Sequence, residues 1–417
     1  MPQPDFRRHF ATLLGGNGAA FALQLAAAPV LTRLFTPEDF GVYANAMALA
    51  GLLGVVGAGR YEQAIVRSGA EAHALARMTL RMTAVSMLVA CAVCAVAQVP
   101  LMRIGGLPPG LAVLGVPLLG GALLAHGILV QLANSRGDSR RMALAKSGYA
   151  AATAGAGIAL GLSGLSTSPY SGYALPAAAL FGFVAVTPVL LPVLRTPRGE
   201  AAEAVAPREL RRRFRDFPRW NLPLALADIL NQQVLFNAVF TGVFGAGAMG
   251  LYGVTWRYLR APAGVVTASA SALFYREAAA SPGGVLPHFY AALRHVAVFA
   301  VPLTAVLVVG GPWLFEAVLG PGWGEAGRYA AVLAPAIGLG MLSGAVSSLP
   351  MAVGRQRAFT VASVGGSTAA LAGLGVAGAA GWGAEAALGV YSALVCVQYG
   401  ALLVWFRKLA LPKFAAR

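Results

Sequence analysis

The feature that most constrains this chain is a succession of twelve long apolar segments separated by short polar breaks. A helix that crosses a bilayer needs about 20 mostly apolar residues, and each segment has that length. Only 11% of the residues are charged, against about 25% in an average soluble domain, so a water-soluble enzyme is excluded. The segments lie near residues 10–31, 40–66, 75–96, 111–134, 142–162, 174–194, 217–240, 249–274, 289–310, 329–349, 358–379 and 384–406.

The remainder of the 417 residues leaves only short connections and tails, so no water-soluble domain of ordinary size fits between the segments. The segments lack the alternating strand pattern of an outer-membrane barrel. They are apolar on every face and rich in Ala and Gly, which lets helices approach closely in lipid. The sequence therefore predicts an all-α integral membrane protein with twelve transmembrane helices, whose activity takes place within the bilayer.

The few charges present are strongly basic: 31 Lys and Arg residues stand against 15 Asp and Glu residues, for a net charge of +16. On a soluble protein this excess would indicate nucleic-acid binding, but membrane proteins concentrate Lys and Arg in cytoplasmic loops. When the N-terminus is placed in the cytoplasm and twelve spans alternate, the opposite side receives only Arg33, Arg103 and Arg328. We therefore expect both termini in the cytoplasm and no nucleic-acid partner.

The longest polar stretch, residues 195–219, joins the sixth and seventh segments and contains three consecutive arginines, Arg211 to Arg213. It is either a docking element for anionic lipid or a partner, or a linker whose charges only fix the topology. The second interpretation is favoured, because the charge rule alone accounts for it. The predicted organisation is an N-terminal six-helix lobe (1–194), a basic cytoplasmic linker (195–216) and a C-terminal six-helix lobe (217–417).

The two predicted lobes resemble each other. Residues 32–43, between the first two helices, align without gaps with residues 241–252, between the seventh and eighth, so that Thr, Phe, Gly and Tyr coincide. The same offset places Gln24 on Gln233 and carries helices three to six onto helices nine to twelve. Because six is an even number, both lobes have the same orientation and are related by a pseudo-twofold axis along the membrane normal, as in some secondary transporters.

The orientation rule leaves two arginines of the eighth segment unexplained, because Arg257 and Arg260 lie within the apolar run. Ionisable side chains at membrane depth usually face a cavity or a partner. Tyr252, Trp256 and Arg260 are spaced by four residues and so share one helix face. Arg binds phosphate bidentately, and Trp and Tyr suit stacking on sugar rings. This face is therefore predicted to bind a polyanionic ligand that carries sugars.

Polar residues also gather in the first, second and seventh segments, which together with the eighth are the first two helices of each repeat. A central cavity lined by these four helices is the simplest interpretation. Its further candidate residues are Asn17, Gln24, Asn45, Arg60, Asn231 and Gln232. Asp228 is a candidate proton or sodium site, or alternatively a salt-bridge partner of Arg257 or Arg260. The alternative for Arg60 is that its long side chain only extends to the membrane interface.

The sequence shows no pattern typical of catalysis or metal binding. Cys91 and Cys94 have a CxxC spacing, but they lie in an apolar helix without further ligands. The pair Lys146-Ser147 lacks the glycines of a phosphate-binding loop. We therefore expect no catalytic residue, no metal and no cofactor. The sequence leaves a proton or sodium gradient as the candidate energy source for transport.

Several motifs together resemble one transporter family. Arg60-Tyr-Glu-Gln-Ala-Ile-Val66 follows the first repeat stretch. Phe217-Pro, Leu222-Pro and Gln232-Gln233 mark the seventh helix, Gly250-Leu-Tyr252 the eighth, and Trp323-Gly-Glu-Ala-Gly327 the loop before the tenth. In this order and spacing they resemble bacterial Wzx-type polysaccharide (O-antigen) flippases of the multidrug/oligosaccharidyl-lipid/polysaccharide (MOP) exporter superfamily, which includes the MATE transporters. The resemblance covers nearly the whole chain.

This resemblance implies a fold of two six-helix lobes that works by alternating access in the bacterial inner membrane. It implies a substrate, an oligosaccharide repeat unit linked to undecaprenyl pyrophosphate, that is moved from the cytoplasmic to the outer leaflet for lipopolysaccharide or exopolysaccharide assembly. It also implies a polysaccharide polymerase or assembly complex as a partner. The alternatives are a cation-coupled multidrug antiporter of the same superfamily, a membrane glycan polymerase or ligase, and a non-transporting scaffold.

Overall fold

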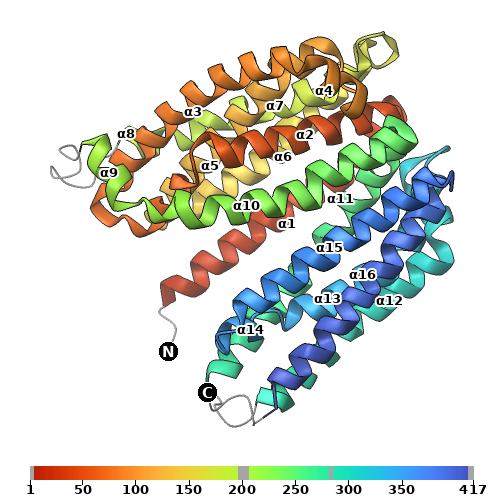
Figure 1. Ribbon diagram of the computed structural model, residues 1–417. Helices are drawn as coiled ribbons and strands as arrows, with labels where there is room; N and C mark the ends of the chain where they lie inside the picture. The colour runs from red at the N-terminus through yellow and green to blue at the C-terminus, as the bar shows by residue number, and fades with distance from the viewer. Residues whose placement is uncertain (1–3, 196–205, 281–284, 412–417) are drawn as a thin grey trace. The chain divides into compact units, whose positions relative to one another are not determined.

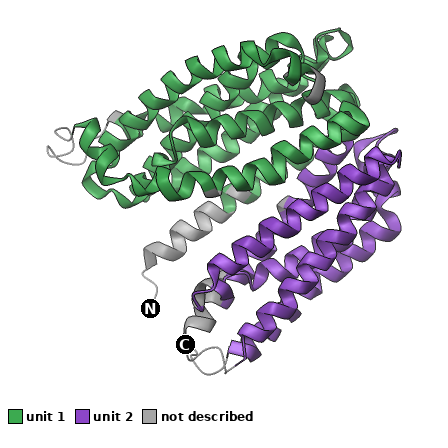
Figure 2. Cartoon of the chain, viewed as in Figure 1, with its two compact units in different colours: residues 1–250 green, residues 251–417 purple. Residues whose placement is uncertain are grey.

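The computed structural model describes residues 4–195, 206–280 and 285–411 (Figure 1). These residues are almost entirely helical and contain no β-strand. They form two compact units, residues 1–250 and 251–417 (Figure 2). Each of the twelve predicted apolar segments corresponds to a helix or a helical run, so the predicted fold class is confirmed. The boundary between the two compact units lies after Gly250, whereas the sequence places the boundary between the lobes at residues 195–216. The predicted lobe division therefore remains a prediction.

Unit 1 contains the helices of the first seven segments. Helix α2 begins at a capping box, in which the Thr36 hydroxyl accepts from the Asp39 amide and the Asp39 carboxylate accepts from the Thr36 amide. Helix α1 packs on α6, α6 packs on α7, and α2 packs on α5 and α10. The helices are α1 (Pro4–Leu34), α2 (Pro37–Gly57), α3 (Ala72–Val96), α4 (Gln98–Gly105), α5 (Val116–Ser135), α6 (Ser139–Leu162), α7 (Ser171–Leu190), α8 (Pro192–Arg195), α9 (Pro207–Arg213) and α10 (Leu222–Ile229).

The seventh and eighth segments belong to one helical run that is broken at Gly245. It begins with a π-turn, η6 (Phe217–Asn221), continues through α10 and a second π-turn, η7 (Leu230–Val234), and enters α11 (Leu235–Ala280). Inside α11, Gly245 has φ 86° and ψ 170°, a conformation that glycine adopts readily, and it breaks the helix. The break falls between the two predicted segments and separates them.

Unit 2 contains the remainder of α11 together with α12 (Val285–Leu319), α13 (Gly324–Ala345), α14 (Leu349–Ala352), α15 (Gln356–Ala379) and α16 (Ala384–Leu409). Helix α13 packs on both α12 and α16, and α16 also packs on α15. Small residues allow the closest of these approaches: Gly311 of α12 and Gly327 of α13 each leave no room for a Cβ atom against the other's backbone.

Nine helical stretches of the described residues are long and apolar enough to cross a membrane. One of them, residues 217–271, contains the seventh segment and most of the eighth. The second predicted segment was too long: α2 ends at Gly57, and residues 61–67 form a separate 3₁₀ helix, η1 (Tyr61–Arg67). The reason is local, because Gly59 and Arg60 both have left-handed backbone conformations, which end the helix.

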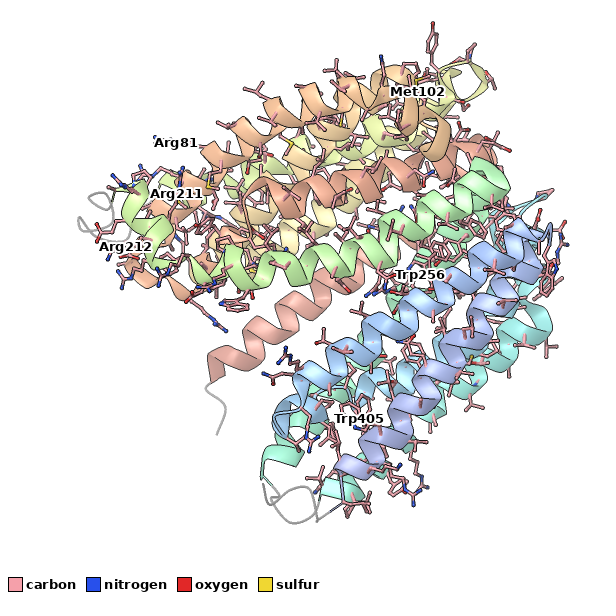
Figure 3. The ribbon with its side chains drawn as sticks, viewed as in Figure 1. Arg81, Met102, Arg211, Arg212, Trp256 and Trp405 are labelled. Atoms are coloured by element: carbon pink, nitrogen blue, oxygen red, sulfur yellow. The ribbon has the colours of Figure 1, made fainter. Side chains whose placement is uncertain are left out.

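Part of the predicted linker is packed onto unit 1. Leu210 of α9 is only 1% exposed and belongs to the hydrophobic core that contains Ile65 and Leu132. The Tyr61 hydroxyl donates to the Arg211 carbonyl oxygen at 3.3 Å, and Arg213 forms an ion pair with Glu71. Helix α9 is therefore an integral element of this unit, with Arg211 and Arg212 at the same end as Arg81 and opposite to Met102 (Figure 3).

The internal repeat has a structural counterpart within unit 1. Under the alignment of residues 32–43 with 241–252, Pro37 corresponds to Ala246 and Gly41 to Gly250. A Cβ atom on Gly41 would overlap the Ala246 carbonyl oxygen, and one on Gly250 would overlap the Pro37 carbonyl oxygen. Corresponding residues therefore make reciprocal contacts, which is the pattern of a twofold-related interface.

We predict that Gly250→Ala destabilises the protein by about 1–3 kcal/mol, because the added methyl group overlaps backbone that cannot move away as a side chain can. Thermal unfolding of the purified protein in detergent measures this. Gly264→Ala, in the same helix, is the control, because a Cβ atom there meets no other atom within 4 Å. Equal melting temperatures for the two variants would contradict the reciprocal contact.

We further predict that Leu210→Ala lowers the free energy of unfolding by about 2–5 kcal/mol, as is usual for a buried leucine. A linker that only fixes topology would not respond in this way. Arg212→Ala on the exposed face of α9 is the matched control, with little expected change. Comparable stabilities of the two variants in thermal unfolding would show that α9 is not anchored.

Candidate functional site

The eighth span carries the predicted face of aromatic and cationic side chains as one continuous ladder. The rings of Tyr252 and Trp256 stack with centroids 5.9 Å apart and planes 16° apart. The Arg260 guanidinium lies over the Trp256 ring, with its Cζ atom 5.2 Å from the ring centroid. The structure thus brings these three predicted residues together by the four-residue spacing along α11 (Figure 3, which labels Trp256).

The ladder runs from a buried end to an exposed end. Tyr252 is 4% exposed, Trp256 is half-buried and Arg260 is exposed. A cation stacked on an aromatic face keeps its outer N–H donors free for another ligand, and the ring attracts the charge electrostatically. The exposed guanidinium at the end of the ladder is therefore the group that a ligand would meet.

Helix α16 contributes two tyrosines within electrostatic range of Arg260, which sequence spacing did not indicate. Tyr391 and Tyr399 both interact electrostatically with Arg260. They are two turns apart on α16, and Tyr399 lies against Gly340 of α13, where a Cβ atom would come within 3.0 Å of the ring. A pattern search confined to α11 misses them, because they come from the last span. The candidate site in unit 2 consists of Tyr252, Trp256, Arg260, Tyr391 and Tyr399.

Arg257, the second predicted cation, is half-buried, whereas Arg260 is exposed. It lies about 100° around the helix from Trp256 and about 60° from Arg260, so it borders the ladder on one side. The two arginines thus differ in exposure, and the Arg260 guanidinium lies over the Trp256 ring.

The seventh span places its polar residues around the π-turn η7. The Gln232 amide donates to the Asp228 carboxylate oxygen Oδ1, and both side chains are exposed, while Asn231 is half-buried. π-Turns interrupt regular helix hydrogen bonding and are frequent at functional sites. Asp228 and Gln232 therefore lie on one face of the span, where the amide of Gln232 donates to the carboxylate of Asp228.

The candidates of the first two spans differ in their surroundings. Asn45 is 3% exposed, and its amide donates to the Gly105 carbonyl oxygen at 2.7 Å and to the Thr241 hydroxyl at 2.9 Å, so it ties α2 to α4 and α11. Gln24 is half-buried on α1. Asn17 belongs to α1, but its side chain lies outside the described residues.

Arg60 pairs with a carboxylate that was not among the predicted site residues. Its Nη1 atom lies 3.4 Å from Oε1 of Glu62, which is 6% exposed. Burial raises the pKa of the Glu62 carboxyl above its ordinary value, and the Arg60 charge opposes this effect. Side chains two apart point to different sides of an α-helix, so only the left-handed turn at Arg60 makes the pair. The sequence carries no signal for it.

Comparisons with known proteins bear on the family and the fold of this chain. Residues 30–328 match the model of the family described as "Polysaccharide biosynthesis protein". No curated protein sequence matches the chain.

Solved structures share the fold at low sequence identity. The lipid II flippase MurJ in an inward closed conformation has a TM-score of 0.73 and 11% identity, covering 94% of this chain and 87% of that chain. An inward-facing MATE family multidrug transporter of the MOP superfamily has a TM-score of 0.60 and 15% identity, covering 95% and 94%. A MOP superfamily transporter from Pyrococcus furiosus has a TM-score of 0.55 and 15% identity, covering 96% and 93%.

The two kinds of similarity carry different weight. Structures at this level of identity show the fold alone, whereas the family model matches well over half of the chain. The helical membrane fold and the matched residues together place the chain: it belongs to the polysaccharide biosynthesis protein family, with the fold of MOP superfamily transporters.

Proposed function

We propose that this protein is a flippase that moves oligosaccharide repeat units linked to undecaprenyl pyrophosphate from the cytoplasmic to the outer leaflet of the bacterial inner membrane. It acts by alternating access, without chemical conversion of the substrate, and serves surface polysaccharide assembly. Both termini lie in the cytoplasm, as the distribution of basic residues indicates.

The observation that carries this proposal is the ladder of Tyr252, Trp256 and Arg260. Its two rings offer flat apolar faces of the kind on which sugars stack, and its terminal guanidinium offers donors that match phosphate geometry. A pyrophosphate linked to sugars needs both groups side by side. Arg260 stays charged at any physiological pH, so it can hold a phosphate without a proton of its own to lose.

The charge of the candidate residues favours this substrate over a cationic drug. Arg60, Arg257 and Arg260 are cations, whereas Asp228 is the one acid among the predicted site residues, and its carboxylate accepts from Gln232. A site for cationic drugs would place carboxylates near its aromatic rings instead. The family of polysaccharide biosynthesis proteins supports the same choice of substrate class.

Within this proposal, Asp228 and the proton or sodium gradient supply the coupling that returns the transporter to its starting state. Asp228 is exposed, and its carboxylate accepts a hydrogen bond from the Gln232 amide, so a small cation has access to it. Reconstitution with a proton gradient, a sodium gradient or neither identifies the ion.

The first test is leaflet transfer in proteoliposomes that contain purified lipid-linked oligosaccharide. Arg260→Gln is expected to lower the transfer rate about 10- to 100-fold, since a hydrogen bond to a charged group contributes about 1.5–3 kcal/mol. Arg357→Gln, on an exposed turn of α15, is the matched control with an unchanged rate. Transfer by Arg260→Gln at the parent rate would refute the role of the ladder.

A second test separates the aromatic contribution. Trp256→Leu keeps an apolar side chain but removes the aromatic ring. We expect this variant to lose more affinity for the lipid-linked oligosaccharide than for undecaprenyl pyrophosphate without sugars. The quantity to compare is the ratio of the two affinities in parent and variant. An unchanged ratio would argue against sugar stacking at this position.

A cell that lacks the gene should lose surface polysaccharide and accumulate the lipid-linked repeat unit on the cytoplasmic side. Normal surface glycan in that strain would overturn the proposed function. A strain that carries Arg260→Gln should show the same accumulation while the protein remains inserted in the membrane, which distinguishes a transporter from a scaffold.

A further inference from the structure

The connection between α2 and α3 holds Arg60 in an unusual conformation. Arg60 has φ 64°, and it is the one residue other than glycine with a positive φ in the described part of the chain. This region costs an ordinary residue roughly 1–2 kcal/mol, and such outliers gather at functional sites. The turn is braced from outside, because Tyr61 bonds to the Arg211 carbonyl oxygen at 3.3 Å and Gly59 lies against Pro218 of η6.

The turn brings Arg60 and Glu62 together in a loose ion pair. Their closest atoms are 3.4 Å apart, whereas a good charge-assisted hydrogen bond is about 2.7–2.9 Å long. Among the described residues, Glu62 Oε2 is buried without a hydrogen-bond partner, and so is Arg60 Nε. Both partners of this pair therefore retain unused hydrogen-bonding capacity, which is costly for a buried group.

The two side chains differ in accessibility. The Glu62 side chain is 7% exposed and the Arg60 side chain is 26% exposed. A soluble anion can thus reach the guanidinium, while the carboxylate behind it stays in an environment that disfavours its charge. Protonation of Glu62 removes the cost of its buried charge and ends the attraction that holds Arg60.

The other charged groups around this turn are engaged elsewhere or exposed, and Arg60 is the charged side chain that acts on Glu62. The elements packed against η1 are η2 (Gly69–Glu71), α3, α5, η6 and α9, whose Arg211 carbonyl oxygen accepts from Tyr61. On the first four elements the titratable and charged side chains are Glu71, which pairs with Arg213; His73, which contacts Arg136 after α5; Arg77 and Arg81, exposed on α3; His126, against Tyr149 and Phe183; and Arg219, over Trp220. On α9 the side chains of Arg208, Glu209, Arg211 and Arg212 are exposed, as is Arg67 of η1 itself.

We propose that Arg60 is a binding residue for phosphate-type anions and that proton uptake by Glu62 releases it for that role. In the resting pair the carboxylate holds the guanidinium. One proton from solution adds to the Glu62 carboxylate, the ion pair opens, and the Arg60 N–H donors turn to the anion. Proton and anion binding therefore favour each other by the same factor, as linkage requires. The inference rests on the proposed function for the natural anion, the pyrophosphate of the lipid-linked substrate.

The test uses the full-length protein in nanodiscs of zwitterionic lipid, with sucrose octasulfate as the probe, because its charge does not change over the pH range. Binding is measured calorimetrically between about pH 5 and 8. The parent should bind more tightly as the pH falls, by about 5- to 150-fold in total and by at most about tenfold per pH unit for one linked proton.

Three variants separate the groups. Glu62→Gln keeps the shape and the acceptor oxygen but cannot ionise, so it should bind tightly at every pH. Arg60→Gln should bind weakly at every pH. Glu71→Gln, a carboxylate close by in sequence that pairs with Arg213, is the matched control and should keep the parent's pH dependence. Retention of that dependence in Glu62→Gln, or of parent affinity in Arg60→Gln, would overturn the proposal.

Because this assay measures binding and not transport, its result is independent of the leaflet-transfer experiment. A second arm adds phosphatidylglycerol to the nanodiscs. Competition with the probe in the parent but not in Arg60→Gln supports the site and identifies membrane phospholipid as an occupant, while absence of competition supports a dedicated substrate anion.

Thermal stability supplies a check on folding. Because the folded state raises the pKa of Glu62, it binds the proton more tightly than the unfolded state, and stability falls as the pH rises through this window. Glu62→Gln should therefore melt at a higher temperature than the parent at about pH 7, with the difference vanishing below about pH 4. A lower melting temperature than the parent at neutral pH would contradict a strained carboxylate.

Discussion

The structure depends on one constraint: inside a bilayer no water is present to hydrogen-bond the backbone, so each span must satisfy its own peptide groups as a helix. Lipid also removes the hydrophobic force between helices, because a lipid tail is as apolar as a leucine side chain. Close packing then depends on small residues. The pairs Gly41 with Ala246, Gly250 with Pro37, and Gly311 with Gly327 are among the places where the described helices bring backbone against backbone.

Placing a polar side chain in an apolar environment costs free energy, and the polar side chains of the described residues meet this cost in different ways. The Asn45 amide joins α2 to α4 and α11 by hydrogen bonds, and the Asp39 carboxylate caps α2. The ion pair of Arg213 and Glu71 joins α9 to the rest of unit 1. Arg260 differs from all of these, because aromatic rings support it while its donors remain exposed. That contrast separates polar residues that hold the fold together from the one best suited to a ligand.

Much of the fold could be predicted because the length of apolar segments and a spacing of four residues are local patterns that do not depend on how the helices pack. These patterns gave the helical segments, the repeat and the ladder of Tyr252, Trp256 and Arg260. The rest depends on contacts between residues far apart in the chain. Tyr391 and Tyr399 join Arg260 from the last span, and Leu210 anchors a stretch that reads as a polar linker. The Arg60 and Glu62 pair depends on a backbone turn that no side-chain pattern encodes.

The reciprocal contact of Gly41 and Gly250 has a consequence for the origin of the chain. In a homodimer of six-helix subunits, a single glycine codon would have served both sides of this contact, and any larger residue there would have damaged the interface twice. In the single chain each glycine has its own codon, but each still faces backbone of the segment that the alignment pairs with its own. The two aligned segments therefore differ in their polar residues, as at Asn45 and Val254, while the crossing at these glycines leaves no room for a side chain.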